Sequence, residues 1–266
     1  MNENEMILAG GNVNEVIRIG ETVRRPLKSW SPTIHKLLKH LEKNTFKWAP
    51  QFYGIDEKNR EILSFIHGEA AVEFPRLKAY MMTDEVLIDI ANILKSFHDI
   101  SASFDRHIDD EWMLSYPGTL PIEVICHNDC APYNVVFSGG KVSGIIDFDT
   151  ACPGPRIWDI AYTLYTFVPL GRLVYDPACD VLTNYKSNKH GNNRKKRIAV
   201  FLNAYGMNRR NDLIDQIVFR LETLWNTLII KANDGDEVFK KMIDEGHLVH
   251  YQDEIKFIKM HGHEWV

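Results

Sequence analysis

The sequence of 266 residues has little cysteine, no excess of positive charge and no long apolar run. Its four cysteines, Cys126, Cys130, Cys152 and Cys179, match no zinc-binding spacing and are few for a disulfide scaffold, which favours reduced thiols. The chain has 31 Lys and Arg against 36 Asp and Glu. That balance argues against a nucleic-acid-binding protein, which usually presents a basic face. No apolar run is long enough to cross a bilayer.

The N-terminal sequence MNENEMILAGGN is polar and lacks the apolar core of a signal peptide. The composition, 45% hydrophobic and 25% charged, is ordinary for a globular protein. We therefore expect a cytoplasmic protein, monomeric or homodimeric, that binds neither nucleic acid nor membranes.

The first 66 residues are predicted to form two β-hairpins around one helix. The predicted strand pairs are residues 13–19 with 22–26 and residues 51–54 with 61–66. Turn residues such as Gly20 separate β-branched and aromatic residues in both pairs. Ser31 followed by Pro32 is typical of a helix start, with the serine as N-cap.

Beyond residue 66 the pattern becomes helical. Thr83 before Asp84 predicts a capped helix, and two short strands are predicted at 134–137 and 142–148. Everything beyond Asp159, which is taken as the start of a helix, is predicted to be helical. The expected fold class is α+β, with a strand-rich lobe at residues 1–66 and a larger, mainly helical lobe at residues 67–266.

Polar residues are concentrated in the stretch VICHNDCAPYNVVFSGGKVSGIIDFDTACPG, residues 124–154. Asp129 is followed five positions later by Asn134, and thirteen positions after that by Asp147. One loop carboxylate can activate a hydroxyl, while an amide oxygen and a second carboxylate are the ligands that Mg²⁺ prefers. Phosphoryl transfer needs little more than this positioning and charge neutralisation, and protein kinases use the same order of residues. Asp and Asn are also ordinary turn residues, but the paired spacings favour phosphoryl transfer.

The motifs HNDCAPYN, IIDFDTA and WDIA (residues 158–161) resemble those of the aminoglycoside phosphotransferase and choline kinase superfamily, relatives of the protein kinases. The N-terminal GGNVNEVIRIGETVRRP also resembles the nucleotide hairpin of this family, so the resemblance covers nearly the whole chain. It is similar to a bacterial subgroup that includes trifolitoxin-immunity-like proteins. The family has glycine where this chain has Asn128. The resemblance implies a protein-kinase-like two-lobe fold, with a small antiparallel sheet and one helix in the first lobe.

The resemblance also implies roles for the motif residues. Asp129 would be the catalytic base, and His127 would brace its loop by hydrogen bonds. Asn134 and Asp147 would hold Mg²⁺. Asp149 lies where protein kinases have glycine, and it is either a group behind the metal ligands or simply a loop carboxylate.

Two segments of the first lobe are implied to bind ATP or GTP. Gly10, Gly11 and Asn12 form a turn whose backbone N–H groups could hold phosphates. The resemblance places the link between the lobes at Ser64 to Ile66, whose backbone groups would bind the purine edge.

A positive side chain must also reach the phosphates. Strand alternation puts Val23 and Arg25 on one face and Arg24 on the other, so Val23 would contact the base and Arg25 the phosphates. Kinases pair this basic residue with a glutamate on the next helix. The matching helix here has Ile34 and His35, so that ion pair is missing or has another partner.

The function expected from these residues is Mg²⁺-dependent transfer of the γ-phosphoryl group of ATP or GTP. The acceptor would be a hydroxyl of an aminoglycoside-like or other amino-bearing small molecule. The acidic segment NDGDE, residues 233–237, is a candidate to face such a cationic acceptor. The alternative is a kinase-fold immunity or binding protein that sequesters a toxin or ligand without turnover.

Overall fold

The computed structural model describes residues 5–8, 16–208 and 211–266. Within these residues, the N-terminal part forms an antiparallel sheet of five strands in the order β1-β2-β3-β5-β4. The strands are β1 (Met6–Ile7), β2 (Ile17–Ile19), β3 (Thr22–Pro26), β4 (Phe52–Ile55) and β5 (Arg60–Ser64). Both predicted hairpins are confirmed within the described residues, because β2 pairs with β3 and β4 pairs with β5. Residues 13–15 of the first predicted strand lie outside the described residues. The sheet also joins the hairpins, with β3 beside β5.

Helix α1 (Ser31–Lys43) packs its apolar side into the core of the molecule. Its buried face carries Ile34, Leu37, Leu38 and Leu41, at the spacing of an amphipathic helix. The N-cap is Trp30 rather than Ser31, so the predicted cap is wrong by one residue. The Ser31 hydroxyl instead accepts a hydrogen bond from the backbone N–H of Lys28, at 2.9 Å.

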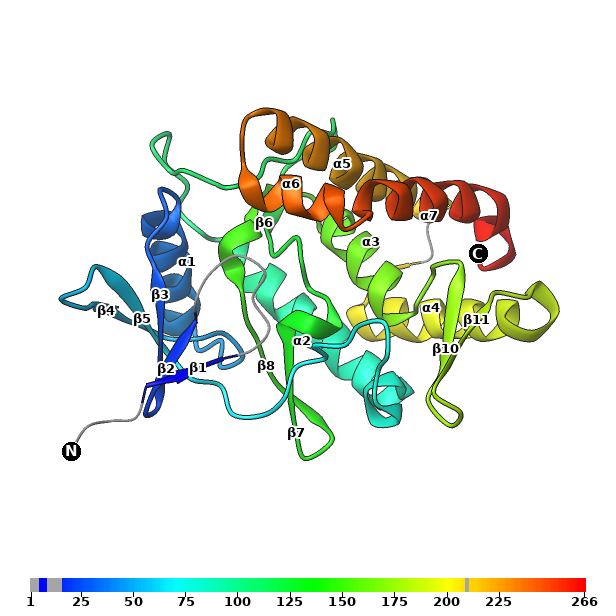
Figure 1. Ribbon diagram of the computed structural model, residues 1–266, viewed down its shortest axis with the longest axis horizontal. Helices are drawn as coiled ribbons and strands as arrows, with labels where there is room; N and C mark the ends of the chain where they lie inside the picture. The colour runs from blue at the N-terminus through cyan, green and yellow to red at the C-terminus, as the bar shows by residue number, and fades with distance from the viewer. Residues whose placement is uncertain (1–4, 9–15, 209–210) are drawn as a thin grey trace.

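Most of the regular secondary structure in the second part of the chain is helical (Figure 1). They are α2 (Asp84–Ser101), α3 (Arg156–Phe167), α4 (Asn192–Tyr205), α5 (Leu213–Asn233), α6 (Glu237–Asp244) and α7 (His247–His261). The predicted cap of α2 is confirmed, since the Thr83 hydroxyl accepts from the Val86 N–H at 3.3 Å. One cluster of buried apolar side chains includes members of α1, α2, α3 and α5, so the core is continuous across residue 66. The lobe boundary at that residue stays a prediction. Among the described residues, no helix is long and apolar enough to span a membrane.

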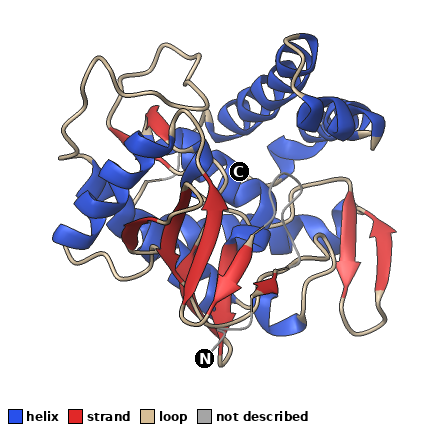
Figure 2. Cartoon of the chain, turned by 60° about the vertical axis from the view of Figure 1, so that its left-hand side comes forward, coloured by secondary structure: helices blue, strands red, loops and turns tan. Residues whose placement is uncertain are grey.

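Two short strand pairs lie within the polar stretch at residues 124–154. The strands of the described chain are red in Figure 2. The pairs are β6 (Val124–Cys126) with β9 (Cys152–Gly154), and β7 (Val135–Ser138) with β8 (Lys141–Ile145). Cys126 pairs directly with Cys152. The loop after β6 and the segment after β8 are therefore brought back to the same place in the fold.

Two expectations for the second lobe are wrong. A hairpin of β10 (Leu173–Asp176) and β11 (Val181–Asn184) interrupts the region predicted to be wholly helical. Its turn contains Pro177 and Asp180, whose φ of 52° breaks any helix there. Helix α3 begins at Arg156, so Asp159 lies inside its first turn, fully buried, and does not start the helix.

Candidate active site

The predicted base, Asp129, lies in the loop between β6 and β7. A single turn of 3₁₀ helix, Pro132–Asn134, folds the loop back on itself. This turn brings the Asn134 amide to Asp129, where its Nδ2 donates to carboxylate Oδ2 at 2.7 Å. The other carboxylate oxygen accepts from the Tyr133 hydroxyl, also at 2.7 Å. The two predicted residues are therefore in contact, and Tyr133 is a third member of the group that the motif did not reveal.

The environment of Asp129 favours a base that works near neutral pH. Burial and, less strongly, the negative charge of Asp147 raise the pKa of the Asp129 carboxyl to about 7. The hydrogen bonds from Tyr133 and Asn134 and the charge of Arg220 act in the opposite direction. Acid–base groups are most effective when their pKa lies close to the working pH.

His127 is fully buried and links the loop to the strand that leads to Asp147. Its Nε2 donates to the Ile146 carbonyl at 3.1 Å, while its Nδ1 accepts from the Asp129 N–H at 3.3 Å. Burial lowers the pKa of the imidazole despite nearby negative charge, which keeps it neutral. Both ring nitrogens are occupied by the backbone, which fits the predicted bracing role.

Asp159 supports the same loop from inside α3. Its carboxylate accepts from the backbone N–H groups of His127, at 2.6 Å, and Asn128, at 3.0 Å. It also contacts Nε2 of His98, at 3.0 Å. Burial acts to raise the pKa of Asp159, but the His98 hydrogen bond and neighbouring charge lower it on balance. The sequence does not indicate that His98 contacts Asp159, because in sequence it is one more residue of the buried face of α2.

The replacement of the family glycine by Asn128 has a backbone explanation. Asn128 has a φ of 67°, in the left-handed region that most side chains avoid. Asparagine tolerates this region better than other non-glycine residues. Here its Nδ2 also donates to the Thr150 carbonyl at 2.8 Å, which ties the loop to the segment after Asp147.

Asn134 and Asp147 present oxygen atoms suited to a hard cation. The Asn134 nitrogen donates to the carboxylate and carbonyl of Asp129, so the amide oxygen takes no part in these two hydrogen bonds. Asp147 has a half-exposed side chain and accepts a hydrogen bond from Nη1 of Arg25 at 3.1 Å. An amide oxygen and a carboxylate fit Mg²⁺, which prefers oxygen ligands.

Arg25 has a partner that the helix sequence did not offer. Its Nε donates to Glu61 of β5 at 2.7 Å. Its two other nitrogens contact Asp147 and Asp149 across the lobes, at 3.1 and 2.8 Å. The burial of Arg25 would lower its pKa, but the three surrounding carboxylates raise it above the ordinary value. Asp149 is thus a partner of Arg25.

The remaining predicted nucleotide residues are placed as follows. Val23 is partly buried and pairs with Leu63. The backbone N–H of Ser64 donates to the Gln51 carbonyl at 2.9 Å, so this N–H is already used within the protein. The Ile66 side chain packs against β8, where a Cβ at Gly144 would lie only 2.6 Å from it. The predicted turn residues Gly10, Gly11 and Asn12 lie outside the described residues.

Arg24 lies on the opposite face of β3 from Arg25, as strand alternation predicts. Its Nε is 3.6 Å from the Asp56 carboxylate, and one of its other nitrogens donates to the Thr22 hydroxyl at 2.6 Å. None of these contacts involves the loop between β6 and β7 that carries Asp129.

Arg220 of α5 is a further residue that the motifs did not indicate. Its side chain is buried, donates to the Asn128 carbonyl at 2.6 Å, and lies over the rings of Trp158 and Tyr162. The Tyr162 hydroxyl is in turn 2.9 Å from that of Tyr133. Aromatic hydroxyls and one arginine therefore adjoin Asp129 on the side of the late helices.

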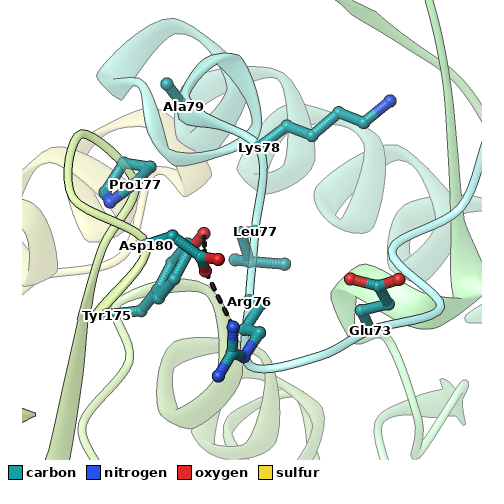
Figure 3. Close-up of a pocket in the computed structure, with 8 residues that line it drawn as sticks. All are labelled: Glu73, Arg76, Leu77, Lys78, Ala79, Tyr175, Pro177 and Asp180. Atoms are coloured by element: carbon teal, nitrogen blue, oxygen red, sulfur yellow. Dashed lines mark hydrogen bonds and ion pairs between the residues drawn. The ribbon is translucent and has the colours of Figure 1, made fainter. Parts of the chain in front are cut away.

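Two other regions of the described chain form no hydrogen bond or ion pair with Asp129. The acidic segment 233–237 forms the turn between α5 and α6, where the Asp236 side chain caps α6. A hollow of about 380 Å³ lies between residues 73–79 and the β10–β11 hairpin (Figure 3). Arg76 and Asp180 form an ion pair at its edge, at 2.8 Å, and none of the predicted site residues lines it.

Comparison with known proteins agrees with this geometry. Residues 102–180 match the model of a phosphotransferase enzyme family. The chain is also 30% identical over 220 residues to the trifolitoxin immunity protein of Rhizobium leguminosarum bv. trifolii, covering 80% of this chain and 79% of the relative. The chain belongs to the phosphotransferase enzyme family. The motif resemblance is thereby confirmed.

Solved structures show the same fold as this family member. An amicoumacin kinase in complex with AMP-PNP and Ca²⁺ superposes with a TM-score of 0.64 at 10% identity, covering 92% of this chain and 89% of that one. A putative aminoglycoside phosphotransferase from Ralstonia eutropha JMP134 superposes with a TM-score of 0.60 at 13% identity, covering 97% and 92%. The predicted protein-kinase-like fold is confirmed, and family membership supports a small-molecule phosphotransferase.

Proposed function

We propose that the protein is a Mg²⁺-dependent kinase that transfers the γ-phosphoryl group of ATP or GTP to a hydroxyl of a small molecule. The acceptor would be aminoglycoside-like or would otherwise carry amino groups. The observation that carries the proposal is the Asp129 carboxylate, oriented by Tyr133 and Asn134 and raised in pKa to about 7. Of the two candidate cation ligands, Asn134 contacts this carboxylate directly, and the negative charge of Asp147 helps to raise its pKa.

Each side chain has a separate task in this proposal. Asp129 orients the acceptor hydroxyl and takes its proton. The Asn134 oxygen and Asp147 would hold the cation, which neutralises charge on the phosphates when it is bound. Arg25 would bind phosphate oxygens with the two nitrogens that now contact carboxylates.

The solved amicoumacin kinase contains a nucleotide analogue and a divalent cation, which supports both kinds of ligand here. The choice between ATP and GTP depends on backbone groups at Ser64 and Ile66, so both nucleotides belong in the assay. Action in the cytoplasm, by a monomer or a homodimer, stays a prediction.

A second candidate is a protein that sequesters a toxin or ligand without turnover. It is favoured by one finding, the similarity to a relative named as an immunity protein. Such a protein would have no need of a proton acceptor at residue 129.

The substitution Asp129→Asn separates the two candidates. Asparagine keeps the shape of the side chain but cannot accept the proton, so turnover should fall by roughly 10²–10⁴ while nucleotide binding is retained. Turnover is measured with Mg-ATP and Mg-GTP against a panel of amino-bearing hydroxyl compounds. The control Asp147→Asn removes a cation ligand and should weaken nucleotide binding as well. Full turnover by Asp129→Asn would contradict the kinase proposal. If the variant protected cells from a toxic compound as well as the wild type does, and neither protein turned that compound over, the second candidate would be supported.

A further inference from the structure

The carboxylate partner of Arg25 comes from a strand, whereas kinases take the corresponding glutamate from the helix after β3. The helix that follows β3 has no glutamate at the matching positions, which are Ile34 and His35. Glu61 of β5 lies directly opposite Arg25 in the pairing of β3 with β5. Because this register places the two side chains on one face of the sheet, a carboxylate reaches Arg25 from within the sheet.

The contacts around Glu61 form a continuous chain from helix to site. Its Oε1 accepts from Arg25 Nε at 2.7 Å, and its Oε2 is 2.7 Å from Nε2 of His35 on α1. The His35 ring stacks on Phe52 of β4, with ring centroids 3.7 Å apart. Both carboxylate oxygens of Glu61 are therefore engaged, one by Arg25 and the other by a His35 ring that is itself held by packing on Phe52.

The charge state of Glu61 suits this position. Its side chain is only 3% exposed, so burial alone would raise its pKa. The hydrogen bond from His35 and the charge of Arg25 nevertheless lower the pKa below the ordinary value. A buried carboxylate of this kind is costly to leave unpaired, which argues for a specific task.

We infer that Glu61 replaces the helix glutamate of kinases as the positioning residue for Arg25, and that His35 connects it to α1. By taking Nε, Glu61 directs the two remaining nitrogens of Arg25 toward the phosphates. In protein kinases, the corresponding ion pair depends on the placement of the helix. Here the pair lies between neighbouring strands, so Arg25 is oriented without any movement of α1. This inference rests on the proposed nucleotide site.

Glu61→Gln tests the positioning role by calorimetric titration with Mg-ATP, which needs no acceptor. The variant keeps the shape but loses the charge, so the dissociation constant should rise roughly tenfold. His35→Phe should raise it by less, about threefold, because Arg25 keeps its carboxylate. The KM for the acceptor should not change in either variant, whereas a general loss of structure would change both constants.

Asp56→Asn is the matched control, since Asp56 lies in the turn directly after β4 and pairs with Arg24 and Arg60 on the other face of the sheet. It should bind Mg-ATP like the wild type. A ¹⁵N-detected Arg25 Nε–H signal, shifted by its carboxylate partner in the wild type, should lose that shift in Glu61→Gln. Unchanged Mg-ATP affinity in Glu61→Gln beside normal wild-type binding would overturn this inference alone. Absence of ATP and GTP binding by the wild type would overturn the proposed nucleotide site and this inference together.

Discussion

At the scale of single residues, the Asp129 carboxylate links geometry to a pH dependence. Because burial raises its pKa to about 7, it is protonated and inactive as a base below that pH. We expect kcat/KM to fall about tenfold per pH unit on the acid side of pH 7. The hydrogen bond from Tyr133 lowers the pKa of Asp129, so Tyr133→Phe should move this acid limb to higher pH. A pH profile of kcat/KM for both proteins measures the shift.

Tyr165→Phe is the control for this profile. Tyr165 is a buried tyrosine of α3 whose hydroxyl contacts His250, at 3.4 Å, rather than Asp129. Its acid limb should coincide with that of the wild type. A limb that stays in place in Tyr133→Phe, or moves to lower pH, would show that the tyrosine does not hold Asp129 in the working enzyme.

Asn128 gives a second prediction at this scale, on stability. Alanine and glycine at this position both lose the side-chain hydrogen bond to Thr150, but only alanine keeps the strain of a φ of 67°. Asn128→Ala should therefore be less stable than Asn128→Gly by about 1 kcal/mol. Urea unfolding of the two variants measures this difference in free energy of unfolding. Equal stabilities would mean that the loop relaxes out of the left-handed region.

The residues that could be predicted from sequence are those whose spacing is short and regular. Asp129 and Asn134 are five residues apart, and one turn of 3₁₀ helix brings them into contact. Glu61 could not be predicted as the partner of Arg25, because their meeting depends on which strands pair and in which register. Tyr133 lies inside the motif, but nothing in the spacing indicates that its hydroxyl turns back to the carboxylate.

At the scale of elements, strand β3 separates two arginines that are neighbours in sequence. Arg25 contacts Asp147 in the segment after β8, whereas Arg24 contacts Asp56 on the other face. Arg25→Ala should weaken Mg-nucleotide binding by at least about tenfold, since it removes a charge-assisted contact to phosphate. Arg24→Ala should leave the affinity within about twofold. Calorimetric titration of both variants decides the matter, and equal losses would show that the two faces of β3 are not distinct in solution.

Elements with strong local signals were predicted, and elements that depend on tertiary packing were not. The Thr83 cap and the apolar stripe identify α2 without further help. The hairpin β10–β11 has four residues in each strand and an irregular apolar pattern, so periodicity did not distinguish it from a helical region. The predicted start of α3 is wrong because Asp159, a common capping residue, instead accepts from the backbone of the loop that carries Asp129.

At the scale of the whole molecule, the fold was predicted from motifs that lie between residues 10 and 161 and occur in the same order as in the family. The N-terminal sheet lies at one end of the molecule and the helices α4 and α7 lie at the other (Figure 1). Between them, Arg25 of the sheet contacts Asp147 and Asp149 of the second lobe. The predicted nucleotide and cation ligands thus come from both lobes, and a bound nucleotide would join them.

This arrangement predicts that Mg²⁺ and nucleotide together stabilise the protein more than either does alone. A ligand at one hundred times its dissociation constant adds about 2.7 kcal/mol to the free energy of unfolding, which for a chain of this size is roughly 5–10 °C in melting temperature. The cation is needed because nucleotide phosphates would otherwise approach the carboxylates of Asp147 and Asp149 with only Arg25 to offset the repulsion. Thermal melts with ATP or GTP, with and without Mg²⁺, measure the effect. Asp147→Asn is the control, and its melting temperature should depend far less on Mg²⁺. If neither nucleotide at millimolar concentration shifts the wild-type melt, the two lobes do not share a nucleotide site.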